Sequence, residues 1–107
     1  ALIGYVEHLK QETGIVAYMI GHAGDGNIHV EFPFADQDEY ERCMVMNGLI
    51  VEKALELGGT STGEHGVGLG KARYMAKEHG GALDVMRAIK QTLDPKGILN
   101  PGKIFIG

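Results

Sequence analysis

The sequence predicts an α+β fold in which an antiparallel β-hairpin is flanked by helices. Two apolar, partly β-branched segments, 15–22 and 27–34, stand on either side of the pair Asp25-Gly26, a strong signal for a hairpin turn. Apolar residues recur at helical spacing before and after this hairpin. The chain has 107 residues, enough for one small domain and too few for two independent cores. We therefore expect residues 1–107 to form one module, or a piece of one.

A helix is expected on each side of the hairpin. Over residues 1–12 the apolar side chains share one helical face, and a glycine follows. After the hairpin, Asp36 provides a capping acceptor and Glu39 lies three residues further on, which is typical of a helix N-terminus. The apolar face of this second helix includes Cys43, which we interpret as a core residue, and Gly58-Gly59 ends the helix.

The second half of the chain predicts a glycine-rich loop followed by a helical tail. The loop covers residues 59–70, and helical spacing marks 71–79 and 83–93. An Asp-Pro pair ends the last helix, because the residue before a proline disfavours helical geometry. A turn over 97–103 and an extended segment over 104–106 complete the chain.

Charge and cysteine content exclude several classes of partner. The net charge of −4 and the pI near 5.7 argue against a nucleic-acid-binding protein, which needs a concentrated basic surface. The single cysteine cannot form an internal disulfide, so we expect a reducing, cytoplasmic location, either free or peripheral to a membrane. No apolar run approaches the roughly 20 residues of a membrane span. Because the chain begins at Ala1 within a predicted helix, we expect it to be part of a longer polypeptide.

Glycine is the residue type that departs most from ordinary composition. It accounts for 17 of the 107 residues, and nine of these lie in two stretches, 21–26 and 58–70. Glycine lets the backbone approach a ligand closely. The clustering therefore directs attention to the histidines and the glutamate in and beside these stretches.

Two histidines and a glutamate have the residue types of an open metal site. If Asp25 and Gly26 are the central residues of a two-residue turn, His22 lies directly opposite His29 and both imidazoles project from one face of the hairpin. Glu64, in the glycine-rich loop, provides a third ligand. Two histidines and a carboxylate leave a position on the metal open for substrate or water.

His65, adjacent to this glutamate, is a candidate base beside such a metal. The residues alone leave other interpretations open. The two hairpin histidines are equally consistent with a cross-strand pair that packs or is solvated, and the Glu-His dipeptide with an exposed polar loop. Two further classes of function also remain: a metal-dependent hydrolase that activates water at the same site, and a non-catalytic interaction module.

Three motifs, at residues 21–29, 63–68 and 94–103, closely resemble the C-terminal region of FAD-linked 2-hydroxyacid oxidoreductases. This family includes D-lactate dehydrogenase of the cytochrome type, the glycolate oxidase FAD subunit and D-2-hydroxyglutarate dehydrogenase. The resemblance implies that residues 1–107 are the C-terminal substrate- and metal-binding part of such an enzyme. It implies a piece of a ferredoxin-like cap domain plus a C-terminal helical tail, with the N-terminal FAD-binding domain of the same polypeptide absent from these residues.

The resemblance also implies roles for individual residues. His22, His29 and Glu64 would ligate a divalent metal, usually zinc, that holds the hydroxyl and carboxylate of a small 2-hydroxy acid. His65 would take the hydroxyl proton while a hydride passes from C2 to FAD. Asn100 would approach the flavin ring, with a turn-forming Asn-Pro pair as the alternative interpretation.

Two other positions bear on the substrate. Family members that act on a dicarboxylate carry Asn two residues after the second histidine, and Glu31 stands there in this sequence. An acid at this position favours a monocarboxylate such as lactate or glycolate. Lys71 is interpreted as a solvated lysine at a helix start, with contact to an anionic substrate or the flavin as the alternative. The sequence does not identify the electron acceptor, and we expect the isolated chain to be inactive and to self-associate through exposed apolar surface.

Overall fold

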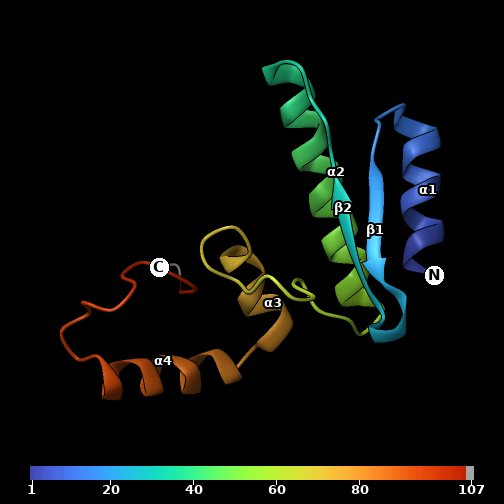
Figure 1. Cartoon of the computed structure of the whole chain (residues 1–107). Coiled ribbons are helices and arrows are strands. Elements are labelled where there is room, and N and C mark those ends of the chain that lie inside the picture. The colour runs from blue at the N-terminus through green and yellow to red at the C-terminus, as the bar shows by residue number, and fades with distance from the viewer. Residues whose placement is uncertain (106–107) are drawn as a thin grey trace. The chain divides into compact units, whose positions relative to one another are not determined.

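The computed structural model describes residues 1–105 and confirms the α+β class. The chain forms two compact units, Ala1–Gly63 and Glu64–Gly107. In the first unit, two helices accompany a two-stranded antiparallel sheet (Figure 1). Its elements are α1 (Leu2–Thr13), β1 (Tyr18–His22), the 3-10 turn η1 (Ala23–Asp25), β2 (Asn27–Glu31) and α2 (Gln37–Glu56).

Both helices of the first unit pack on one face of the hairpin. Val6 of α1 and Met46 of α2 are almost fully buried, and Leu9 and Ile50 join them in the core. Met19 packs against this cluster, as does its cross-strand partner Val30. Because side chains alternate across a strand, the residues between these positions project to the opposite face of the hairpin.

The predicted N-terminus of α2 is confirmed in detail. The Oδ1 atom of Asp36 accepts a hydrogen bond from the backbone N–H of Glu39 at 2.8 Å. The Oε2 atom of Glu39 in turn accepts from the backbone N–H of Ala35 at 2.7 Å. These bonds satisfy backbone donors that a helix end leaves without partners. Further along α2, Cys43 is buried, as expected for a core residue.

The two strands are shorter than predicted. The ladder ends at the pair Tyr18 and Glu31, although the expected strands extended over 15–22 and 27–34. Continuing the same register would place Pro33 opposite Val16. Proline has no N–H to donate to a ladder, so the pairing stops before it.

The predicted register of the hairpin is wrong by two residues. His22 pairs with Asn27, and His29 pairs with Ile20, so the two histidines do not lie directly opposite each other. The loop contains four residues rather than two. A type I′ turn needs positive φ at both central positions, and in this turn only Gly26 has it, with φ 72°.

The second unit contains the predicted helical tail. Its elements are the 3-10 turn η2 (Ala72–Tyr74), α3 (Met75–His79) and α4 (Ala82–Leu93). The expected extended segment over 104–106 is not observed at Ile104, which has a φ of 68°, and Ile106 lies outside the described residues. The N–H of Ile104 instead donates to the carbonyl of Gly68 at 2.6 Å, which joins the end of the chain to the glycine-rich loop.

Candidate functional site

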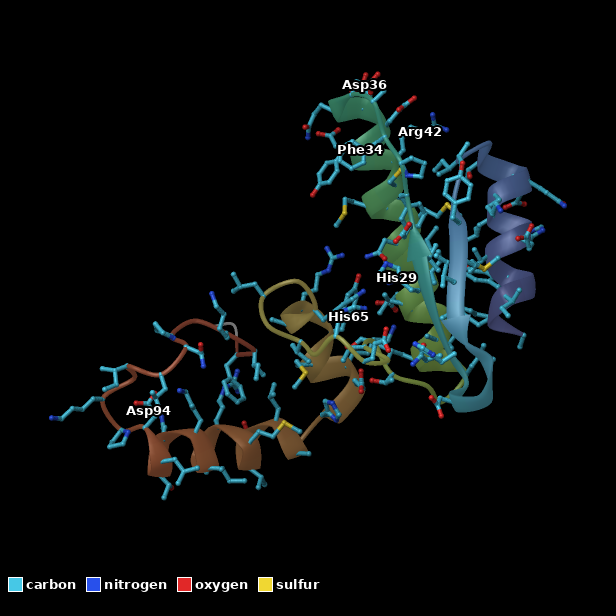
Figure 2. All side chains as sticks on the ribbon, viewed as in Figure 1. His29, Phe34, Asp36, Arg42, His65 and Asp94 are labelled. Carbon is cyan, nitrogen blue, oxygen red and sulfur yellow. The ribbon has the colours of Figure 1, made fainter. Side chains whose placement is uncertain are left out.

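His22 and His29 share the exposed outer face of the hairpin. In the observed register His22 pairs with Asn27 and His29 pairs with Ile20. The two histidines are therefore diagonal neighbours across the ladder. Diagonal neighbours lie roughly 7–8 Å apart, within reach of long side chains. Both histidines are exposed, and Figure 2 labels His29 on β2. The common face therefore agrees with the prediction, although the direct pairing does not.

Glu31 lies on the same face as His29. Its Oε1 atom is 3.8 Å from Nε2 of His29, and both side chains are about half exposed. A carboxylate beside a histidine can orient the imidazole and raise its basicity as a ligand.

Gly63 ends the first unit in close contact with the hairpin. A Cβ atom at this position would lie 2.9 Å from Cβ and 3.2 Å from Cγ of Asn27, the cross-strand partner of His22. Such a separation is tighter than ordinary side-chain contact allows. Glycine is therefore needed where the glycine-rich loop passes the start of β2.

Glu64 and His65 lie in contact at the start of the second unit. Nε2 of His65 lies 3.3 Å from Oε1 of Glu64, and both side chains are exposed. A carboxylate has two oxygens and about four lone-pair positions, so this contact leaves Glu64 able to accept further partners. Among residues 1–105, no group of three or more His, Cys, Asp or Glu side chains is placed together as metal ligands.

Asp94 organises the turn that carries Asn100. Lys90 Nζ donates to Oδ2 of Asp94 at 2.5 Å, and the backbone N–H groups of Ile98 and Leu99 donate to the same carboxylate at 3.0 Å each. Lys90 also donates to the carbonyl of Leu99 at 2.6 Å. Asn100 follows in a left-handed conformation, with φ 44°, and is exposed. The buried carboxylate at the end of α4 therefore fixes the backbone that presents Asn100 (Figure 2).

The sequence indicated Asp94 only as a helix terminator. Its hydrogen bonds, above all the one from Lys90, lower the pKa of the Asp94 carboxyl below its ordinary value of 3.8. The spacing of Lys90 and Asp94 could have indicated this contact, because residues four apart lie on the same face of a helix.

Lys71 is not the solvated lysine that the sequence predicted. It is half-buried, and its Nζ lies 5.7 Å from the ring centroid of Tyr74. Burial lowers the pKa of Lys71 below 10.5, and the nearby charge of Arg73 lowers it further. The Lys71 ammonium is therefore held near a second cation and partly away from water.

The first unit has a hollow of about 350 Å³ between the α1–β1 connection and the start of α2. None of the predicted metal ligands, the candidate base or Asn100 lines it. The residues that do are Gly14, Ile15, Val16, Tyr18, Pro33, Glu39, Arg42 and Cys43. In the part of the chain that the structure describes, no helix has both the length and the apolar character needed to cross a membrane.

Comparison with known proteins identifies the family of this chain. A family model described as "FAD linked oxidases, C-terminal domain" matches residues 1–104. The match covers nearly the whole chain, including the hairpin, the Glu64-His65 loop and the turn after α4. The chain therefore belongs to the FAD-linked oxidase C-terminal domain family.

Individual relatives agree with this assignment. The chain is 46% identical over 96 residues to D-lactate dehydrogenase [cytochrome] 1, mitochondrial, of Saccharomyces cerevisiae, covering 89% of this chain and 16% of the relative. It is 51% identical over 109 aligned positions to glycolate oxidase subunit GlcD of Bacillus subtilis, covering 97% and 23%. A D-lactate dehydrogenase of Anaerostipes hadrus is 39% identical over 104 residues, covering 94% and 22%. The chain thus spans less than a quarter of the length of these relatives.

Proposed function

We propose that this chain is the substrate- and metal-binding part of a FAD-dependent oxidoreductase that converts a small 2-hydroxy acid into the corresponding 2-oxo acid. The observation that carries the proposal is the family match over residues 1–104, whose named relatives include D-lactate dehydrogenase and glycolate oxidase. The proposal also assigns a task to the exposed histidines of the hairpin and to the Glu64-His65 pair.

By residue type alone, the proposed donors suit a divalent metal such as zinc. His22 and His29 present imidazoles from one exposed face of the hairpin, and Glu64 adds an exposed carboxylate. Histidine nitrogens and carboxylate oxygens are ordinary zinc ligands, and three protein ligands leave a position for substrate. In this proposal the three residues hold the metal, and the Glu31 carboxylate orients His29.

His65 carries the proton chemistry of the proposal. Its imidazole takes the proton from the substrate hydroxyl, since imidazole is suited to proton transfer near neutral pH. The Glu64 carboxylate beside it, 3.3 Å from Nε2, stabilises the resulting imidazolium. A bound metal would supply Lewis acidity that lowers the pKa of the substrate hydroxyl, and FAD would supply the hydride acceptor, so that two electrons and two protons would leave the acid in total.

Asn100 contributes a polar group toward the flavin in this proposal. Its left-handed backbone is fixed by the Asp94 and Lys90 hydrogen bonds, and its exposed amide can both donate and accept. For the substrate, the negative charge at Glu31 favours a monocarboxylate.

The metal content of the full-length, FAD-loaded protein tests the ligand set. His22→Ala and His29→Ala are each expected to lower bound zinc, measured by elemental analysis, and to lower D-lactate or glycolate oxidation by at least about a hundredfold. His8→Ala is the matched control, because His8 is another exposed histidine beside a carboxylate, 3.2 Å from Glu12. Equal zinc content in all three variants would contradict the proposed ligands.

A further inference from the structure

Lys71 and Arg73 form a cationic pair on one aromatic ring in the second unit. Lys71 Nζ lies 5.7 Å from the ring centroid of Tyr74, and Arg73 Cζ lies 4.8 Å from the same centroid. Arg73 Nη2 also donates to the Tyr74 hydroxyl at 2.7 Å. The ring itself is buried, with 6% of its residue surface exposed, so it anchors both cations in place.

The pair lacks a compensating carboxylate. Among residues 1–105, no Asp or Glu forms an ion pair with Lys71 or Arg73. Lys53 provides a contrast within the same chain. It lies 5.4 Å from the ring centroid of Tyr5, and its charge is partly balanced by Glu56, 3.6 Å away. Lys71 is partly buried and Arg73 is exposed. Two neighbouring cations, one of them partly desolvated, repel each other, and a bound anion would relieve that repulsion.

The loop that precedes Lys71 has open space at three of its glycines. The glycine-rich loop folds back on Lys71, whose N–H donates to the carbonyl of Val67 at 3.2 Å. A Cβ atom at Gly66, Gly68 or Gly70 would meet no atom within 4 Å, so this loop leaves its surroundings open. At these three positions an approaching ligand would meet backbone rather than a side chain.

We propose that Lys71 and Arg73, held on the Tyr74 ring beside the open Gly66–Gly70 loop, bind an anionic group with two or more oxygens. The ammonium has three donors, and the guanidinium keeps four N–H groups beyond the one used by Tyr74, which suits a carboxylate or a phosphate. The proposal rests on the proposed function, which provides both sources of this chemistry: the carboxylate of the 2-hydroxy acid and the phosphates of FAD.

The test compares Lys71→Met and Arg73→Met with Lys53→Met in the full-length, FAD-loaded protein. The control removes a lysine of the same kind that also lies over a tyrosine ring. Pyruvate binding to the oxidised protein is followed by the change in flavin absorbance. FAD and riboflavin binding to the apoprotein are followed by flavin fluorescence, since riboflavin has the same ring system without the phosphates.

A carboxylate ligand predicts that both variants weaken pyruvate binding by about tenfold or more while FAD affinity is unchanged. A phosphate ligand predicts a loss of similar size for FAD and none for riboflavin. In either case Lys71→Arg is expected to restore most of the affinity, because it keeps the charge. Lys53→Met is expected to change neither the affinity for pyruvate nor the affinity for FAD.

Affinities within about twofold of the unmodified protein for pyruvate, FAD and riboflavin in both variants would overturn the anion site. Failure of the proposed function is recognised separately. A protein that binds FAD but oxidises neither D-lactate nor glycolate would contradict the proposed reaction. In that case the anion site is judged only by whether the variants weaken the binding of FAD relative to riboflavin.

Discussion

Replacing Gly21 by alanine tests whether the observed register of the hairpin is correct. A Cβ atom at Gly21 would overlap the carbonyl oxygen of Asn27 and would lie 3.0 Å from Cα and 3.2 Å from Cγ2 of Ile28. Two of these three atoms belong to the backbone of β2, so a side-chain rotation cannot relieve the clash. The strands must separate where Gly21 pairs with Ile28.

The magnitude follows from two opposing terms. Overpacking against a fixed backbone costs about 1–3 kcal/mol. Removing a glycine from the unfolded chain stabilises the folded state by about 0.4–1 kcal/mol where the native conformation tolerates alanine. Gly24 isolates the second term, because it lies in the same hairpin loop, lacks positive φ and would place an added Cβ more than 4 Å from any surrounding atom.

Because both variants share the unfolded-state term, the free energies of unfolding of Gly21→Ala and Gly24→Ala are expected to differ by the overpacking term alone, about 1–3 kcal/mol, with Gly21→Ala the less stable. Urea denaturation of the chain, followed by far-ultraviolet circular dichroism, measures this difference. Two variants within about 0.5 kcal/mol of each other would refute the close approach of β2 to Gly21, and with it the observed register.

Two further predictions concern charged residues. Asp94→Asn is expected to lower the urea midpoint at neutral pH, because the folded state holds the Asp94 pKa below 3.8. The difference in midpoint between the variant and the unmodified protein should shrink as the pH falls through this lowered pKa, because the native carboxylate then also becomes protonated. Midpoints measured at pH 7 and about pH 3 check this, and an unchanged deficit at the lower pH would be inconsistent with it. Glu31→Gln in the full-length protein is expected to raise kcat/KM for 2-hydroxyglutarate relative to D-lactate by about tenfold, since it removes a negative charge beside His29. An unchanged ratio would mean that Glu31 does not face the substrate.

Much of the local structure was predictable from the sequence, because local rules govern it. The capping pattern of Asp36 and Glu39 defined the start of α2, and apolar spacing defined its buried face. The motifs at residues 21–29, 63–68 and 94–103 were sufficient to indicate the family that the comparison identifies. Each of these features depends on residues close together in the chain.

The register of the hairpin could not be decided in this way. Moving one strand by two residues leaves every side chain on the same face, so the apolar pattern is identical in both registers. The choice depends on the turn, where Gly26 alone has positive φ, and on the packing of Met19 and Val30 against the helices. The shared face of His22 and His29 was therefore predictable, whereas their partners across the ladder were not.

The roles of Lys71 and Asp94 likewise depend on tertiary structure. In the sequence, one is a lysine after a glycine and the other an aspartate before a proline. The fold places the lysine and Arg73 on one buried tyrosine ring, and it places three N–H donors around the aspartate. Residue type determines which charges the chain carries. Only the fold determines how far each charge is removed from water and which groups surround it, and these two quantities set the strength of its interactions.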